Sequence, residues 1–94
     1  MTMYRVVASS GFARDLRKLA KRDTALFGIV DRCIHILETD PFNRTSGYHI
    51  KKLGGLKVGE GQWRIRVGEY RVRYDIFEGD VLLYSFRHRK DAYR

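Results

Sequence analysis

Apolar and basic residues alternate with a period of two along residues 62–74, and this alternation predicts β-structure rather than a helix. Gly68 and Glu69 interrupt the alternation, and a two-residue loop with glycine first suits a type II′ hairpin turn. The turn sets the pairing, so that Trp63 lies opposite Tyr74 and one face of the hairpin is apolar. The opposite face, which we call the arginine face, carries Arg64, Arg66, Arg71 and Arg73.

A second alternating run, residues 81–89, predicts a further strand that pairs with the end of this hairpin. A three-residue loop over residues 78–80 places Tyr74 opposite Tyr84, whereas a two-residue loop would place Ser85 in the core. Because a slip of one residue turns every side chain to the other face, the three-residue loop is the predicted one. In this register the arginine face also receives Phe77, Leu83, Ser85, Arg87 and Arg89.

Helical periodicity replaces the alternation in the first half of the chain. Residues 3–8 read as a short strand, and apolar residues at helical spacing then predict a helix over residues 11–22. Ser9 or Ser10 suits its N-cap, because a serine hydroxyl accepts a hydrogen bond from a backbone N–H of the first turn. The apolar positions of this helix are Phe12, Leu16, Leu19 and Ala20.

A second predicted helix starts at Asp23 or Thr24, either of which suits the N-cap, and runs to about Glu38. It ends before Pro41, since the residue that precedes a proline is disfavoured in the α region. The very short linker between the two helices predicts an antiparallel helical hairpin. The core positions of the second helix are Leu26, Val30, Cys33 and Leu37, widened by Ile29, Ile34 and Ile36.

The predicted architecture is α+β, in one domain that spans residues 1–94. An N-terminal strand and the helical hairpin pack on one face of an antiparallel sheet of three or four strands. Residues 48–53 give the weakest of the strand signals. The helices cover the apolar face of the sheet, which leaves the arginine face open to solvent or to a partner.

Basic residues outnumber acidic ones, with 19 Lys and Arg against 11 Asp and Glu and a net charge of +8. Such an excess is typical of proteins that bind nucleic acid or an acidic protein. No apolar run approaches the roughly 18 residues of a membrane span, and we identify no signal peptide, so we expect no membrane association. The single Cys33 fits a reducing cytoplasm, where we expect the protein to act.

Two interpretations of the arginine face remain open. Arginines directly opposite each other repel by up to about 1 kcal/mol per pair, so two such pairs are an unfavourable way to make a soluble face. The simpler interpretation is nevertheless a half-buried sheet with a solvated basic face. The functional interpretation is that the face binds an anion, because guanidinium groups about 6.8 Å apart along a strand can each bind a phosphate with two hydrogen bonds.

The chemistry that these residues permit is narrow. His35, His49 and His88 lack ligand spacing with one another or with Cys33, so we expect neither a metal nor another cofactor. Phosphate transfer without a metal remains possible, with arginines stabilising the charge on a pentavalent phosphate. His88 or Tyr93 would then move protons.

Two segments resemble the RelE/ParE toxin superfamily: WRIRVGEYRVRY at residues 63–74 and YSFRHRKDAY at residues 84–93. The Leu53-Gly54-Gly55 sequence and the helical hairpin ahead of them fit as well. The resemblance implies a RelE-like fold and the role of toxin in a type II toxin–antitoxin system, with an antitoxin protein as partner. RelE-type members cut messenger RNA in the ribosomal A site. The ribose 2′-hydroxyl attacks the adjacent phosphate and leaves a 2′,3′-cyclic phosphate.

The resemblance also implies roles for individual residues. Arginine stays protonated up to a pKa above about 12, so Arg64 and Arg66, which stand where RelE-type members usually have lysines, are expected to bind phosphate, and proton transfer is left to His88 or Tyr93. The expected catalytic residues are Arg64, Arg66, Arg71, His88, Arg89 and Tyr93. The residues expected to bind RNA are Lys51, Lys52, Arg73 and Arg87.

The leading hypothesis is therefore a metal-independent, ribosome-dependent mRNA endonuclease. One alternative is a ParE-like toxin that poisons DNA gyrase and has no nuclease chemistry of its own. Another is a non-catalytic basic module that binds nucleic acid. In the toxin hypotheses we expect an acidic or amphipathic antitoxin segment to bind on or beside the arginine face or the helical hairpin.

Overall fold

The computed structural model describes residues 3–90, in which two helices lie against a five-stranded sheet. The sheet order is β1-β5-β4-β3-β2, with β1 parallel to β5 and the other neighbours antiparallel. The elements are β1 Arg5–Ala8, α1 Ser10–Ala20, α2 Leu26–Thr39, β2 Ile50–Lys52, β3 Trp63–Val67, β4 Tyr70–Phe77 and β5 Asp80–His88.

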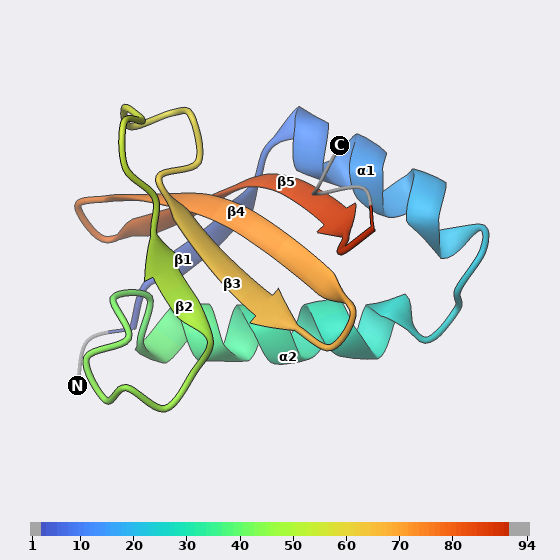
Figure 1. Ribbon diagram of the computed structural model, residues 1–94, viewed down its shortest axis with the longest axis horizontal. Coiled ribbons are helices and arrows are strands. Elements are labelled where there is room, and N and C mark those ends of the chain that lie inside the picture. Colours follow the sequence, from blue (N-terminus) through green and yellow to red (C-terminus); the bar gives the residue numbers. More distant parts are fainter. Residues whose placement is uncertain (1–2, 91–94) are drawn as a thin grey trace.

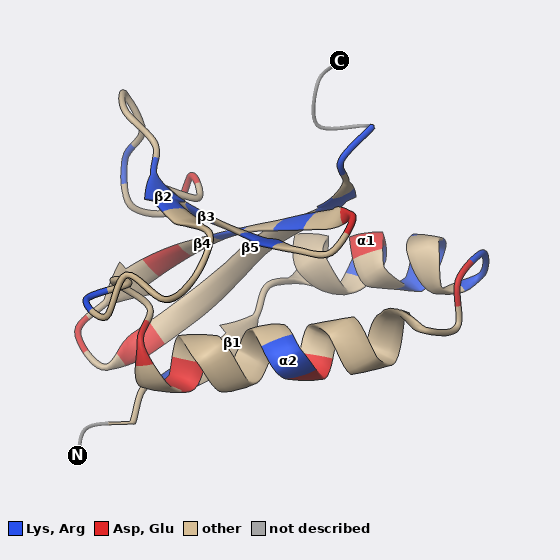
Figure 2. Ribbon diagram, turned by 60° about the horizontal axis from the view of Figure 1, so that its bottom comes forward, with Lys and Arg blue, Asp and Glu red and all other residues tan. Residues whose placement is uncertain are grey.

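Both helices lie on the same side of the sheet and run side by side in opposite directions (Figures 1 and 2). This arrangement confirms the predicted α+β class and the helical hairpin. The sheet has five strands where three or four were expected, because the N-terminal strand β1 joins it as a parallel neighbour of β5 instead of packing on one face. The weakly signalled strand is present as β2 at the other edge. None of the described helices is both long enough and apolar enough to cross a membrane.

The register between β3 and β4 is the one that the alternation predicts. Trp63 pairs with Tyr74, and the pairing continues without a break to Val67 opposite Tyr70. Gly68 has a φ of 57°, the left-handed value that the first central residue of a type II′ turn requires. The apolar side chains of this hairpin therefore face the helices.

The predicted loop between β4 and β5 is wrong by one residue. Glu78 and Gly79 alone connect the strands, and Tyr74 pairs with Leu83 instead of Tyr84. Leu83 is consequently in the core, with 1% of its surface exposed, whereas Tyr84 is 40% exposed. Both outcomes are the reverse of the prediction.

A β-bulge explains how the strand accommodates this shift. The pairing steps from Arg73 opposite Ser85 to Tyr74 opposite Leu83, which leaves Tyr84 as the extra residue of β5. Beyond the bulge the register is as predicted, with Val72 opposite Phe86. The bulge thus allows apolar residues to face the core at both ends of a strand that a single alternating register cannot satisfy.

The helix starts agree with the sequence at α1 and differ from it at α2. Ser9 caps α1, and its hydroxyl accepts a hydrogen bond from the backbone N–H of Phe12 at 3.0 Å. The N-cap of α2 is Ala25, which makes no side-chain capping bond, so the predicted cap at Asp23 or Thr24 is wrong. Asp23 instead accepts hydrogen bonds from the Ala25 N–H and the Tyr70 hydroxyl, both at 3.0 Å, and so ties the interhelical turn to the sheet.

The core lies between the helices and the sheet. The four predicted core positions of α2 are all buried, and burial raises the pKa of the Cys33 thiol to about 12. That thiol is therefore protonated at neutral pH and serves packing rather than nucleophilic chemistry. The buried apolar residues are Phe12, Leu26, Val30, Cys33, Leu37, Ile65, Val67, Tyr70, Val72, Tyr74, Val81, Leu83 and Phe86.

Asp40 closes α2 and organises the loop that follows. Its carboxylate accepts hydrogen bonds from the Arg44 N–H at 2.8 Å and from the Thr45 N–H and hydroxyl at 3.2 and 2.7 Å. Burial acts to raise the pKa of Asp40, but these hydrogen bonds outweigh it and the pKa is lowered. The ionised carboxylate is thus the form that the folded protein stabilises.

Replacing Asp40 by alanine is expected to reduce the free energy of unfolding by about 1.5–3 kcal/mol at neutral pH, the usual range for hydrogen bonds to a charged group. Because the folded-state pKa is lowered, this contribution is present above about pH 4, the ordinary aspartate value, and is lost as the pH falls through the folded-state pKa. Urea unfolding of both proteins at pH 7 and pH 3 measures it. A stability difference that does not shrink at pH 3 would contradict the assignment.

Candidate functional site

The four arginines of the β3–β4 hairpin alternate with the buried Ile65, Val67 and Val72, so they share the side of the sheet away from the helices, as the sequence predicts. Figure 2 shows where the basic residues fall along the strands. Arg64 lies opposite Arg73, and Arg66 lies opposite Arg71, on neighbouring strands β3 and β4. On β5, Arg87 lies opposite Arg71. At the other edge, Lys51 of β2 lies opposite Arg64, so basic residues extend across four strands.

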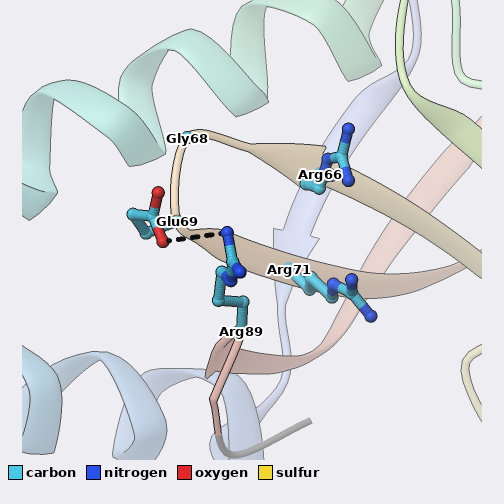
Figure 3. Close-up of a pocket in the computed structure, with 5 residues that line it drawn as sticks. All are labelled: Arg66, Gly68, Glu69, Arg71 and Arg89. Carbon is cyan, nitrogen blue, oxygen red and sulfur yellow. Dashed lines mark ion pairs between the residues drawn. The ribbon is translucent and has the colours of Figure 1, made fainter. Parts of the chain in front are cut away.

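Three of these arginines line one pocket, near the β3–β4 turn. Arg66 comes from β3, Arg71 from β4, and Arg89 from the residue after the end of β5 (Figure 3). The pocket has a volume of about 360 Å³, and Gly68 and Glu69 complete its lining. Arginines from three separate elements of the chain therefore line one hollow.

Backbone pairing beyond β5 brings Arg89 to this place. Its N–H donates to the carbonyl of Glu69 at 2.7 Å, which fastens the chain beside the β3–β4 turn. The side chains also meet, with 3.6 Å between Arg89 Nη1 and Glu69 Oε2. In Figure 3 the Arg89 guanidinium points toward Glu69, while Arg66 and Arg71 extend away from the turn. The ion pair is 58% and 62% exposed, so it contributes little to stability and both groups are accessible to a ligand.

Arg73, at the far end of the arginine face, is engaged by the loop between β2 and β3. Its guanidinium lies 5.2 Å from the centre of the Tyr84 ring. Its Nε donates to the Gly61 carbonyl at 3.2 Å and its Nη2 donates to the Glu60 carbonyl. Arg73 therefore holds this loop against the sheet. For its guanidinium to bind RNA as predicted, these hydrogen bonds would have to break.

Asp75 of β4 also fastens the loop between β2 and β3 to the sheet. It is buried and accepts hydrogen bonds from the N–H of Gly61 at 2.9 Å and of Gln62 at 3.0 Å. Gly61 has a φ of +75°, and a Cβ there would lie 2.9 Å from Cδ2 of Tyr84 and 3.0 Å from Cβ of Arg73. Only glycine permits this close approach, which sets where the loop crosses the arginine face.

Replacing Asp75 by alanine is expected to lower the free energy of unfolding by about 2–3 kcal/mol, because two loop N–H groups lose their buried acceptor. The loop should also loosen locally, with faster amide hydrogen exchange at Gly61 and Gln62. Chemical denaturation and hydrogen exchange measure the two effects. Asp31→Ala, an exposed substitution on α2, is the matched control and should change stability by less than about 0.5 kcal/mol.

Arg87 holds α1 against β5. Its Nη1 donates to Asp15 Oδ1 at 2.8 Å, and Asp15 Oδ2 accepts the N–H of Phe86 at 3.1 Å. Asp15 is buried, so this pair has a clear structural role. The structure thus divides the arginine face into Arg66, Arg71 and Arg89 around the pocket, and Arg73 and Arg87 engaged by neighbouring elements.

The remaining predicted residues lie apart from the pocket arginines. The His88 ring packs edge-on against Tyr70, 5.2 Å between centroids, on the helix side of the sheet. Lys52 is also on that side, with its ammonium 5.7 Å from the centre of the Trp63 ring. Lys51 and Arg64 lie on the arginine face, toward the β2 edge. Tyr93 lies outside the described residues.

Glu69 lines the pocket, but the sequence alone did not indicate it as a candidate functional residue. It was interpreted only as half of a turn, although its position between two basic strands distinguishes it from an ordinary turn residue. Among residues 3–90, no group of three or more His, Cys, Asp or Glu side chains is placed to hold a metal ion. The chemical content of the pocket is therefore three guanidiniums and one carboxylate.

Several solved toxin structures are similar to this one. The toxin–antitoxin complex RelBE2 from Mycobacterium tuberculosis has a chain with 26% identity and a TM-score of 0.70, over 93% of this chain and 99% of that one. The RelE–RelB complex from Pyrococcus horikoshii has a chain with 22% identity and a TM-score of 0.68, over 94% of this chain and 97% of that one. The DinJ–YafQ complex from E. coli has a chain with 13% identity and a TM-score of 0.72, over 98% of this chain and 99% of that one. The last two show similarity of fold alone.

A family comparison places the chain by its sequence. No curated protein matches it significantly. The family described as the ParE toxin of the type II toxin–antitoxin system parDE matches residues 6–93, a span that includes both strands of the arginine hairpin and all the pocket residues. The predicted membership of the RelE/ParE superfamily is thereby confirmed. The chain belongs to the ParE toxin family of type II toxin–antitoxin systems.

Proposed function

We propose that this toxin is a cytoplasmic endoribonuclease that cuts messenger RNA in the A site of the ribosome. The observation that supports the proposal most is the pocket around which Arg66, Arg71 and Arg89 gather. Three guanidiniums from separate parts of the chain suit a ligand with several negatively charged oxygens, and each can bind two of them. A phosphodiester under nucleophilic attack is such a ligand.

The proposed reaction is an internal transfer of the phosphoryl group. The ribose 2′-oxygen attacks the adjacent phosphorus, the bond to the 5′-oxygen of the next nucleotide breaks, and a 2′,3′-cyclic phosphate and a 5′-hydroxyl result. Negative charge grows on the non-bridging oxygens of the pentavalent transition state, where preorganised guanidiniums stabilise it. The arginines supply this positive charge, so the reaction is proposed to be metal-independent.

The proposed partner is a cognate antitoxin. The similar chain from M. tuberculosis was solved in a complex of a toxin with an antitoxin. An acidic or amphipathic segment that covers the arginine face or the helical hairpin would neutralise part of the +8 charge of this chain. An interface that avoids both surfaces would contradict this placement.

The deciding experiment is primer extension on a defined message, with and without programmed ribosomes. Cuts within codons that appear only when ribosomes are present would support the proposal. The products should end in 2′,3′-cyclic phosphates. Intact message under both conditions would contradict it.

Poisoning of DNA gyrase is the second candidate function, and the match to the ParE toxin family favours it. In that case the toxin acts by holding gyrase on cleaved DNA and leaves messages intact. A supercoiling assay with purified gyrase, run beside the primer extension, separates the two candidates. Accumulation of linear DNA with gyrase, without cuts in the message, would transfer the function to this candidate.

A further inference from the structure

Of the described residues that line the pocket, three are arginines, and the reaction also needs a group that takes the proton from the 2′-hydroxyl. Arginine holds its proton up to a pKa above about 12, so the three pocket arginines do not act as bases near neutral pH. His88 faces Tyr70 on the other side of the sheet, and its Nδ1 accepts the N–H of Lys90 at 3.2 Å. Among the residues that line the pocket, Glu69 is the one whose side chain accepts a proton readily.

We propose that Glu69 is the general base of the cleavage reaction, an inference that rests on the proposed endoribonuclease function. The Glu69 carboxylate takes the proton of the ribose 2′-hydroxyl as the 2′-oxygen forms its bond to phosphorus. The bond between phosphorus and the 5′-oxygen breaks, and the 5′-oxygen takes a proton from water. The hydroxide left by that water then removes the proton from Glu69, so protons and charge balance over one turnover.

The position of Glu69 supports this role. Its backbone is fixed by the turn at Gly68 and by the 2.7 Å hydrogen bond that its carbonyl accepts from Arg89, so the side chain starts from a defined place. The carboxylate is accessible, at 62% exposure. In Figure 3 it lies at the turn end of the pocket, whereas the Arg66 and Arg71 guanidiniums extend the other way. If Arg66 and Arg71 bind the phosphate, the turn end of the pocket, where Glu69 lies, is available to the ribose that precedes this phosphate.

The position of Glu69 predicts opposite effects on the rate of cleavage and on the affinity for RNA. A carboxylate beside bound phosphates repels them, so Glu69 lowers the affinity for RNA while it raises the rate of cleavage. A residue that only positions Arg89 would raise both quantities. A residue that only competes with phosphate for Arg89 would lower both. Affinity and rate, measured separately, therefore distinguish the three roles.

The test uses Glu69→Gln, which keeps the size of the side chain and removes the base. Cleavage of a defined message on programmed ribosomes gives the rate at saturating toxin, and a message with a 2′-deoxy nucleotide at the cut site gives the affinity without reaction. The expected result is a rate about 10²–10⁴-fold lower together with a higher affinity. Glu69→Asp, which retains a carboxylate, should recover part of the rate. Glu78→Gln, in the exposed turn between β4 and β5, is the matched control and should cleave like the wild type.

Each other outcome overturns the proposal in a recognisable way. Faster cleavage with tighter binding would make Glu69 a competitor for Arg89, and equal losses of rate and affinity would make it a positioning residue. An unchanged rate in Glu69→Gln, with an active wild type, would reject the base while leaving the nuclease function intact. A wild type that cuts nothing would reject the nuclease function and the base together. Equal thermal unfolding temperatures of all variants would show that folding is not the cause.

Discussion

Cleavage of messenger RNA on the ribosome should fall by about 10²–10³-fold when Arg71 is replaced by alanine, the usual effect of removing one donor that stabilises a developing oxyanion. Arg71 lies between Arg66 and Arg87 in the cross-strand register and lines the pocket from the central strand of the arginine face. Single-turnover primer extension at saturating toxin measures the rate. Growth arrest on induction of the toxin should disappear in parallel.

Two further variants make this prediction specific to Arg71. Arg32→Ala removes the same charge from an exposed position on α2 and should leave the rate within about twofold of the wild type, because it lowers only the long-range field. Arg71→Lys keeps the charge but loses the planar two-point hydrogen bond, so a partial loss is expected. If Arg71→Ala and Arg32→Ala lose activity equally, net charge and not the pocket carries the function.

The largest expected effect on stability comes from Phe86. Its side chain is 1% exposed and packs between α1 and the sheet, with ring centroids 5.6 Å from Phe12 and 5.1 Å from Tyr70. Replacing it by alanine is expected to lower the free energy of unfolding by about 3–5 kcal/mol, through lost burial and the cavity left behind. Domains of this size have about 5–15 kcal/mol in total, so the variant should be close to unfolding.

Urea denaturation followed by circular dichroism measures this loss. Phe77→Ala is the matched control, because Phe77 has 58% of its surface exposed at the end of β4 and should contribute within about 0.5 kcal/mol. Similar stability of the two alanine variants would mean that the core does not depend on β5 as described.

The division of the arginine face has a functional consequence. Arg73 donates a hydrogen bond to the β2–β3 loop, and Arg87 donates one to Asp15 of α1. These contacts fasten the loop and the helix to the sheet that carries the pocket. Their replacement should therefore affect stability more than catalysis. Five arginines that look equivalent in the alternating pattern thus divide into two groups by their neighbours.

The predictions from the sequence succeeded where the determining residues are close together. The β3–β4 register followed from an alternation and a glycine-first turn, and the α2 core stripe followed from helical spacing. Ser9 was predictable as the α1 cap because its partner, Phe12, is three residues away. These features depend on steric and hydrogen-bonding preferences of adjacent residues, which the sequence contains in full.

The tertiary structure alone decided features that depend on residues distant in the chain. The bulge at Tyr84 arises because β5 must place Leu83 and Phe86 in the same core, and no local signal marks the extra residue. The engagement of Arg87 depends on Asp15, 72 residues earlier. Likewise, the pocket forms because Arg89 pairs with the backbone of Glu69 in a different hairpin. The pattern determined which residues face away from the core, and packing against neighbouring elements determined which of them surround the candidate site.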